Sequence, residues 1–312
     1  MIIMQNVVSR LLRDIHVQGV TASDKFMLFF VKIVYLSLKI ILSITLSKER
    51  RSRFYIEHEL DFGSFCNKFF RFFKSNNNGS NLLRFKMPKY NFEFYCRNNK
   101  DDFINMTLRE EDIVERFQPK EGDIAVDIGA HIGHYTIVAS KRVGIYGKVV
   151  AIEANPDNFE MLNRNIKLNQ LTNIISLNYA VYSKETKIKL YLAGEESGYT
   201  IYDTIMIERA ARGQENFVEV NAHTLDYLLQ LYGINEVNWI KIDVEGAEYE
   251  VLKGATNMLS KSKDISLLIE IHNLSQGANL YKPILKLLDS CHFRIDFEKA
   301  YDSGERHIIA RK

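Results

Sequence analysis

The sequence predicts an α/β protein built on a doubly wound, mostly parallel sheet. Strand-like apolar runs alternate with helical patterns from residue 123 to residue 274, which is the pattern of repeated strand–helix–strand units. A turn with two glycines, at 129–133, joins the first of these strands to its helix. Two further strand patterns, 293–297 and 306–310, close the chain with no helix between them, so we expect an antiparallel C-terminal edge on the sheet.

The elements carry individual signals. Residues 90–96 alternate as a strand does, and 104–117 reads as a helix before Gly122. Pro156 lies in the first turn of a predicted helix. Residues 187–192 and 217–220 alternate, which predicts a two-stranded insertion. The remaining expected elements are strands at 123–127, 148–152, 173–180, 238–243 and 265–271, and helices at 135–141, 155–168, 247–261 and 281–288.

Composition bounds the organisation of the chain. The 312 residues fit one domain of roughly 200 residues plus an extension better than two equal domains. A turn-rich break at 75–80 separates a helical, partly apolar N-terminal extension, 1–80, from a domain at 81–312. Hydrophobic residues make up 46%, enough for a substantial core. The net charge of +2 gives no global field for nucleic acid, so no nucleic-acid partner is expected.

The cysteines indicate a reducing compartment. Cys66, Cys96 and Cys291 are odd in number and far apart, with neither zinc-like spacing nor a disulfide framework. A cytoplasmic location is therefore expected, and each cysteine is interpreted as a small buried hydrophobe.

The N-terminal extension contains an apolar stretch, 26–46, with no small-residue cleavage site after it. Lys25, Lys32 and Lys39 recur every seven residues and would form one narrow stripe on a helix. An apolar helix with such a stripe suits a membrane surface or a partner helix, contacted through residues 20–53. Packing on the chain's own body is the alternative, and the sequence does not decide between them.

The glycine turn and the next strand indicate a nucleoside-type cofactor. The first strand ends at Asp127, and the turn bears Gly129 and Gly133. The nicotinamide fingerprint does not fit, because His131 stands where its second glycine would approach a pyrophosphate. A ligand without phosphate, such as S-adenosylmethionine, needs no glycine there. Glu153 ends the second strand and could accept hydrogen bonds from both hydroxyls of a ribose. The alternative is a glycine-turned unit that binds nothing.

The carboxyl ends of the predicted strands define the candidate site, because ligands of such sheets bind there. Asp243 and His272 end strands that we expect to be neighbours, so we assign them, with Glu245, to catalysis. His272 would act as general base, since histidine titrates near neutral pH. We expect no metal, because one histidine with carboxylates is a poor diagnostic for magnesium. Alternatively, Glu245 and Glu248 only complement the dipole of the helix that they open, and Thr224-Leu-Asp226 reads as a helix cap.

The chain resembles the FkbM family of S-adenosylmethionine-dependent methyltransferases over about residues 88–311. The resemblance rests on VDIGAHIGHYT at 126–136, GKVVAIEANP at 147–156, NRN at 163–165, TLD at 224–226, KIDVEGAE at 241–248 and VLKG at 251–254. It implies a Rossmann-like methyltransferase fold with S-adenosylmethionine bound by Asp127, Gly129, Gly133 and Glu153. The family often has Asn at position 131, and His131 departs from this. The full set expected at the cofactor is Asp127, Gly129, Ala130, His131, Gly133, Tyr135, Glu153 and Asn178.

The resemblance implies O-methylation of a hydroxyl on a sugar, glycan or secondary metabolite. Two alternatives are an N-methyltransferase and a degenerate fold that serves as a binding module. Against the first, the chain lacks an Asn/Asp-Pro-Pro-aromatic tetrad, and against the second, the acids and glycines of the cofactor turn are all present. Residues 188–216 are expected to form a wall of the substrate site, but their sequence does not indicate whether the acceptor is a sugar, a lipid or a peptide.

Overall fold

The computed structural model describes residues 82–87, 92–97, 111–192, 199–200, 217–272, 280–301 and 304–312. It divides into two compact units, Met1–Arg109 and Glu110–Lys312. In the first unit, β1 (Leu82–Met87) pairs antiparallel with β2 (Phe92–Arg97). Alternate residues of β2 are buried, as the sequence pattern predicted. The helix predicted for 1–80, with its lysine stripe, lies outside the described residues.

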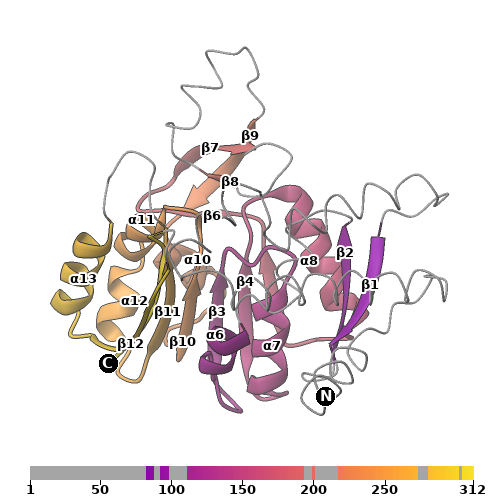
Figure 1. Cartoon of the computed structure of the whole chain (residues 1–312), viewed down its shortest axis with the longest axis horizontal. Coiled ribbons are helices and arrows are strands. Elements are labelled where there is room, and N and C mark those ends of the chain that lie inside the picture. Colours follow the sequence, from indigo (N-terminus) through magenta and orange to yellow (C-terminus); the bar gives the residue numbers. More distant parts are fainter. Residues whose placement is uncertain are drawn as a thin grey trace, which may run out of the picture. The chain divides into compact units, whose positions relative to one another are not determined.

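The second unit is organised around a seven-stranded sheet of order β12-β13-β11-β10-β3-β4-β5 (Figure 1). The strands from β11 to β5 in that order run parallel, whereas β13 is antiparallel to both β11 and β12. The predicted doubly wound sheet with an antiparallel C-terminal edge is therefore confirmed. Its strands are β3 (Ile124–Ile128), β4 (Lys148–Ile152), β5 (Ile174–Leu177), β10 (Trp239–Ile242), β11 (Ser266–Ile271), β12 (Arg294–Ala300) and β13 (Arg306–Arg311).

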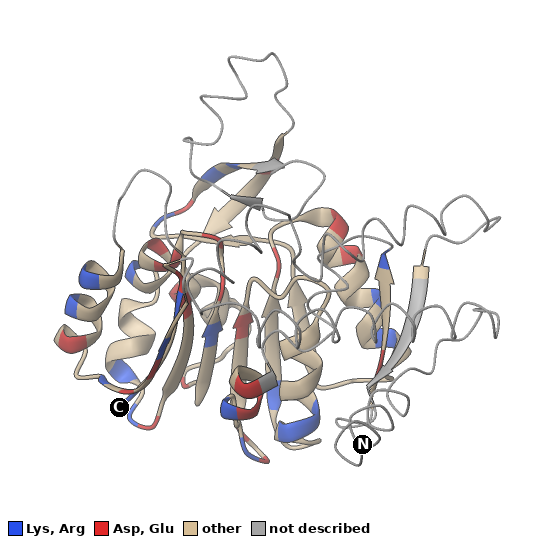
Figure 2. Ribbon diagram, viewed as in Figure 1, with Lys and Arg blue, Asp and Glu red and all other residues tan. Residues whose placement is uncertain are grey.

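Helices cover both faces of this sheet. Val126 and Val150 face a large apolar cluster that includes residues of the helices after residue 224, whereas Ala151 packs on the opposite face against Leu162 of α8. The central strands are buried on both faces, and Figure 2 shows them tan over most of their length. The helices are α6 (Glu111–Arg116), α7 (His134–Val143), α8 (Pro156–Leu168), α10 (Leu225–Leu231), α11 (Glu248–Lys253), α12 (Thr256–Lys261) and α13 (Tyr281–Ser290).

The single helix predicted at 247–261 is wrong, because α11 ends at Gly254 and α12 begins afresh. A Cβ on Gly254 would lie 2.1 Å from the carbonyl oxygen of Tyr182, so only glycine fits there. The carboxylate of Asp226 accepts hydrogen bonds from the backbone N–H groups of Asn257 and Met258, at 3.0 and 2.8 Å, and so caps α12. Thr224 caps α10 as predicted, with its hydroxyl accepting from the N–H of Tyr227.

The predicted insertion forms a second sheet of order β6-β9-β7-β8 (Figure 1). The expected antiparallel pairing of 187–192 with 217–220 is confirmed, and a short strand that continues from β5 extends it. The strands are β6 (Ala180–Val181), β7 (Thr186–Leu192), β8 (Tyr199–Thr200) and β9 (Phe217–His223). Within the described part of the chain, no helix has the length and apolar character needed to cross a bilayer.

Candidate functional site

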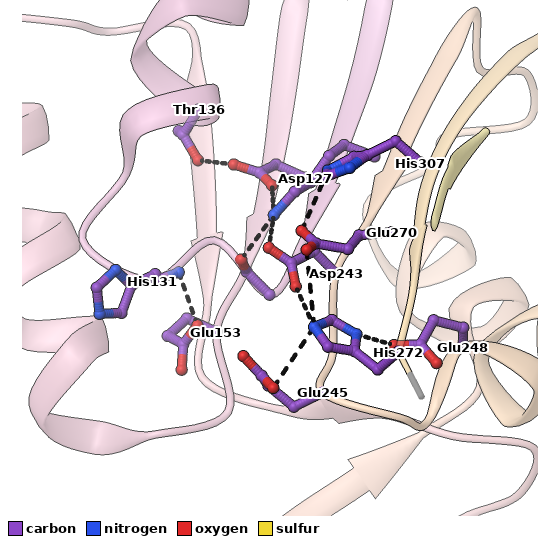
Figure 3. Close-up of polar contacts among 12 residues, drawn as sticks. Asp127, His131, Thr136, Glu153, Asp243, Glu245, Glu248, Glu270, His272 and His307 are labelled. Atoms are coloured by element: carbon purple, nitrogen blue, oxygen red, sulfur yellow. Dashed lines mark hydrogen bonds and ion pairs between the residues drawn. The ribbon is translucent and has the colours of Figure 1, made fainter. Parts of the chain in front are cut away.

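Strand order reverses between β3 and β10, and ligands of open α/β sheets bind at such a switch point. The chain winds outward from β3 through β4 to β5, then returns to lay β10 on the other side of β3. The loops after β3, β4, β10 and β11 carry the polar side chains that Figure 3 shows converging on this place.

A buried lysine stands at the switch point. Lys241 on β10 is the register partner of Asp127 on β3, and its Nζ lies 3.7 Å from Oδ1 of Asp127. The same ammonium group donates to Oδ2 of Asp243, at 3.0 Å, and to the carbonyl oxygen of Gly129, at 3.1 Å. Thr136 donates to the other Asp127 oxygen at 2.6 Å. Lys241 thus joins the glycine turn to the candidate catalytic loop.

The glycines of the turn are required by the packing of the protein on itself. Gly129 has φ +76°, and a Cβ there would lie 1.8 Å from the carbonyl oxygen of Asp243. Gly133 has φ +100°, and its Cβ would lie 2.7 Å from Cδ1 of Leu162. The sequence argument attributed these glycines to the approach of a ligand. In the structure the space beside each is filled by another part of the chain.

Glu153 is held in place by the two loops that flank it. One carboxylate oxygen accepts from the N–H of His131 and the other from the N–H of Asn155, both at 2.8 Å. His131 has φ +51°, a left-handed conformation that Asn, Asp and His adopt more readily than other non-glycine residues do. Asn178 donates from its amide to the carbonyl oxygens of Glu153 and Ala154. Its visible role is therefore to hold the Glu153 loop.

Tyr135 and Ala130 are buried beside the turn. The ring of Tyr135 packs edge-on against Phe117, with Nζ of Lys241 5.0 Å from its centroid. Ala130 packs with Leu162. Both residues shape the walls of the turn, and both were expected at the cofactor from the sequence.

The predicted convergence of Asp243 and His272 on neighbouring strands is confirmed. The Nε2 atom of His272 lies 3.9 Å from Oδ1 of Asp243, 3.5 Å from Oε2 of Glu245 and 3.9 Å from Oε1 of Glu270. Its Nδ1 atom lies 2.8 Å from Oε1 of Glu248. Four carboxylates therefore surround one imidazole (Figure 3).

This charge distribution governs protonation around His272. Burial opposes a charge on the imidazole, but the hydrogen bond that it donates to Glu248 and the nearby charges of Glu245 and Asp243 hold its pKa well above the usual 6.5. Burial, helped by neighbouring carboxylates and opposed by His272, raises the pKa of Glu245 to about 7. The Glu245 side chain is 48% exposed, so solvent screens part of this effect.

The acids nearer the turn respond to burial and to Lys241. Burial raises the pKa of Asp127, which the charge of Lys241 only partly offsets. Burial also raises the pKa of Glu153 against the two backbone hydrogen bonds that favour its charged form. Burial would raise the pKa of Asp243 too, but Lys241 and His272 together outweigh it and lower the value.

Three side chains at this site could share a metal ion. The ligand atoms of Asp243, Glu245 and His272 all lie within 4.8 Å of one another. Asp243 and Glu245 follow β10, and His272 follows β11, so the set is assembled from two adjacent strands.

A model of the methyltransferase FkbM domain matches residues 127–295, more than half of the chain and the whole of this site. The chain belongs to the FkbM methyltransferase family. This FkbM protein is an S-adenosylmethionine-dependent methyltransferase, and S-adenosylmethionine is its cofactor. The resemblance inferred from the sequence motifs is confirmed.

Named relatives of this FkbM methyltransferase have related activities. It is 27% identical over 205 residues to the hexuronic acid methyltransferase AglP of Haloferax volcanii, a match that covers 65% of this chain and 77% of AglP. It is 29% identical over 153 residues to the methyltransferase sdnD of Sordaria araneosa, covering 41% of this chain and 59% of sdnD. A solved S-adenosylmethionine-dependent methyltransferase from Aquifex aeolicus superposes with a TM-score of 0.39 at 16% identity, covering 65% of this chain and 89% of that one.

Sequence reasoning missed the roles of Lys241, Glu248 and the pair of Glu270 with His307. Glu270 and His307 are register partners on β11 and β13, with 3.2 Å between Oε2 and Nε2. A signal for Lys241 was present, because it interrupts the buried strand Trp239–Ile242 and a lysine is almost never buried without a partner.

Proposed function

We propose that this FkbM methyltransferase transfers a methyl group to a hydroxyl of a sugar or glycan, with a hexuronic acid-containing glycan as the leading acceptor. The observation that carries this is the direct abutment of two loops at the switch point. The Gly129 turn, beside Glu153, touches the backbone of Asp243, which belongs to the carboxylate–histidine cluster. One side suits a nucleoside cofactor and the other a hydroxyl-bearing acceptor. The relative named for hexuronic acid methylation supports the choice of acceptor.

The cofactor side fits S-adenosylmethionine. The carboxylate of Glu153 accepts the backbone N–H groups of His131 and Asn155 and a side-chain hydrogen bond from Asn158, which leaves lone-pair capacity for one ribose hydroxyl. Oδ1 of Asp127 is buried and has no hydrogen-bond partner, which leaves an acceptor for the cofactor's amino-acid end. We assign Gly129, Ala130, His131 and Gly133 to the wall of the turn. When bound, the cofactor supplies an activated methyl group on a positively charged sulfur.

The acceptor side positions the hydroxyl. Methyl transfer is an in-line displacement, so the protein contributes mainly by holding the oxygen in line with the methyl carbon. The oxygen lone pair forms the new O–C bond, the electrons of the broken C–S bond return to sulfur, and the hydroxyl proton passes to a basic side chain of the Asp243, Glu245 and His272 cluster. Asp243, Glu245 and His272 lie where that oxygen would be held.

The experiment is methyl transfer from labelled S-adenosylmethionine to three acceptors: a glucuronic acid-terminated oligosaccharide, a neutral oligosaccharide and a peptide. The proposal expects label on the uronic acid sugar in alkali-stable form, as a methyl ether. Alkali-labile label would mean a carboxyl ester, and label on the peptide would mean a different acceptor class. Either result, or label on none of the three, would overturn the proposed acceptor. Glu236→Gln changes an exposed carboxylate before β10, and it serves as the control variant that should transfer label as wild type does.

A further inference from the structure

We propose that Asp243, Glu245 and His272 form a site for one divalent cation of the Mn²⁺/Mg²⁺ kind, which places the acceptor hydroxyl. The role of the cation in methyl transfer rests on the proposed function, whereas its binding does not. This inference replaces the metal-free expectation drawn from the sequence.

The spacing of the ligand atoms is the first argument. Nε2 of His272 lies 3.5 Å from a Glu245 oxygen and 3.9 Å from an Asp243 oxygen. Both distances exceed the range of a hydrogen bond. They suit atoms that each bond one cation at about 2.0–2.4 Å, since two such ligands spread at about 110–120° lie roughly 3.5–4 Å apart.

The orientation of His272 is the second argument. Nδ1 bonds Oε1 of Glu248, a fully buried carboxylate that is itself fixed by the N–H of Gly246 at 2.8 Å. Metal-ligating histidines almost always donate their second ring N–H to a carboxylate or carbonyl in this way. The bond leaves Nε2 directed at Asp243 and Glu245, as Figure 3 shows.

A hydrogen bond from Lys241 fixes the orientation of the Asp243 carboxylate. Its Oδ2 accepts from Lys241, which also holds the carbonyl oxygen of Gly129, so the carboxylate cannot rotate freely. Oδ1 is the oxygen that faces His272. A ligand set presented by the ends of two paired strands is held more firmly than one carried by a long loop.

Charge is the third argument. Asp243, Glu245, Glu248 and Glu270 place four carboxylates around one imidazole. One of them, Glu248, keeps a fully buried oxygen, Oε2, that has no hydrogen-bond partner. Buried charge is costly unless it is paired or coordinates a metal. A dication between Asp243, Glu245 and His272 would add counter-charge for these carboxylates, of which Asp243 is already paired with Lys241.

The ligand set also constrains the acceptor. Imidazole with two carboxylates lies between the sets preferred by zinc and by magnesium, and Mn²⁺ accepts both ligand types. Three protein ligands would leave positions on the cation open to other ligands. Two adjacent positions suit neighbouring oxygens of one sugar, either a vicinal diol or a hydroxyl beside a uronic carboxylate. We therefore infer that the acceptor chelates the cation through two oxygens, one of which is methylated.

Binding of Mn²⁺ alone tests the site. The full-length protein is stripped with a chelator and titrated with Mn²⁺, followed by paramagnetic resonance of free Mn²⁺ and by calorimetry. One Mn²⁺ per chain is expected. Glu245→Gln and His272→Gln should weaken binding at least tenfold, and Glu248→Gln, which disturbs only the orientation of His272, about 10–100-fold. Glu236→Gln should bind as wild type does. Thermal melts identify any variant that fails to fold, and Glu245→Gln is the safest because its side chain is half exposed.

Absence of stoichiometric Mn²⁺ binding, or binding unchanged in Glu245→Gln, overturns the site. Methyl transfer with and without chelator then separates this inference from the proposed function. If methyl transfer to the sugar persists in chelator with no Mn²⁺ bound, the cation site is contradicted and the proposed function is supported. If Mn²⁺ binds stoichiometrically but no sugar is labelled, the cation site is supported and the proposed acceptor is contradicted.

Discussion

Lys241 and Asp127 are register partners on adjacent parallel strands, and their charged atoms lie 3.7 Å apart with side chains 6% and 1% exposed. Asp243 shares the same ammonium group. Replacing a buried ion pair as a whole is often neutral, but removing one partner leaves an uncompensated charge. Removing Lys241 alone would therefore leave the carboxylates of Asp127 and Asp243 without their counter-charge.

Lys241→Met should lower the free energy of unfolding by about 3–5 kcal/mol, because two buried carboxylates lose their counter-charge. Asp127→Asn in the same chain should restore part of this loss. Urea unfolding measures both. Lys187→Met removes an ion pair with Glu219 that is exposed on both sides, and it should change the free energy of unfolding far less. Equal losses for Lys241→Met and Lys187→Met would contradict the prediction.

Gly129→Ala should destabilise the fold far more than Gly122→Ala. Both glycines have positive φ, +76° and +87°, so both substitutions carry a backbone cost of about 1–2 kcal/mol. Only Gly129 also faces backbone, at 1.8 Å from the Asp243 carbonyl oxygen, whereas nothing lies within 4 Å at Gly122. Unfolding curves for the two variants measure the contact alone. Matching midpoints would mean that the strands move apart without cost.

Glu153→Gln should weaken S-adenosylmethionine binding by about 1.5–3 kcal/mol, the range for hydrogen bonds to a charged group. The amide also turns an N–H group toward a backbone N–H of His131 or Asn155, so a smaller loss of stability is expected. Calorimetry at a temperature where the variant is folded separates the two effects. Glu160→Gln, on an exposed ion pair of the neighbouring helix, is the control. Wild-type affinity of Glu153→Gln for S-adenosylmethionine would show that Glu153 does not bind the ribose.

His134, the first residue of α7, should make the fold sensitive to acid. Burial, with the charge of Lys241, lowers its pKa to about 4. The unfolded chain takes up a proton at this residue below about pH 6.5, while the native state stays neutral until about pH 4. Stability therefore falls as the pH drops through that window.

Between pH 7 and pH 4.5, wild type should lose about 1–3 kcal/mol more stability than His134→Gln, which has no such group. Urea unfolding at the two pH values gives the difference directly. Parallel losses in both proteins would show that His134 is accessible to protons in the native state.

The alternation of apolar runs predicted the main sheet and its antiparallel edge, because strands buried on both faces leave a strong pattern. The break between α11 and α12 was not predictable, since it depends on Gly254 meeting the backbone of Tyr182, more than seventy residues earlier in the chain. Short strands such as β6 and β8 carry too few residues to show a period.

At the site, the convergence of Asp243 with His272 followed from the rule that carboxyl ends of parallel strands meet at one edge. The raised pKa of His272 did not, because it depends on the hydrogen bond to Glu248, which helix and strand patterns do not place. Asn178 was assigned to the cofactor from its position at a strand end; its hydrogen bonds to the backbone of Glu153 and Ala154 were not predictable, because they depend on how two loops pack.

The contact between Gly129 and the backbone of Asp243 has a thermodynamic consequence. Neither loop can shift without the other, since the carbonyl of Asp243 occupies the side-chain position of Gly129 and Lys241 bonds both. If the cofactor binds at the Gly129 turn and the acceptor at the Asp243 loop, the ligand that binds first orders both loops. The second ligand then binds with a smaller loss of conformational entropy. By linkage, whatever factor the cofactor applies to acceptor affinity, the acceptor applies equally to cofactor affinity. Such coupling would be measured as an acceptor affinity that changes when S-adenosylmethionine is bound.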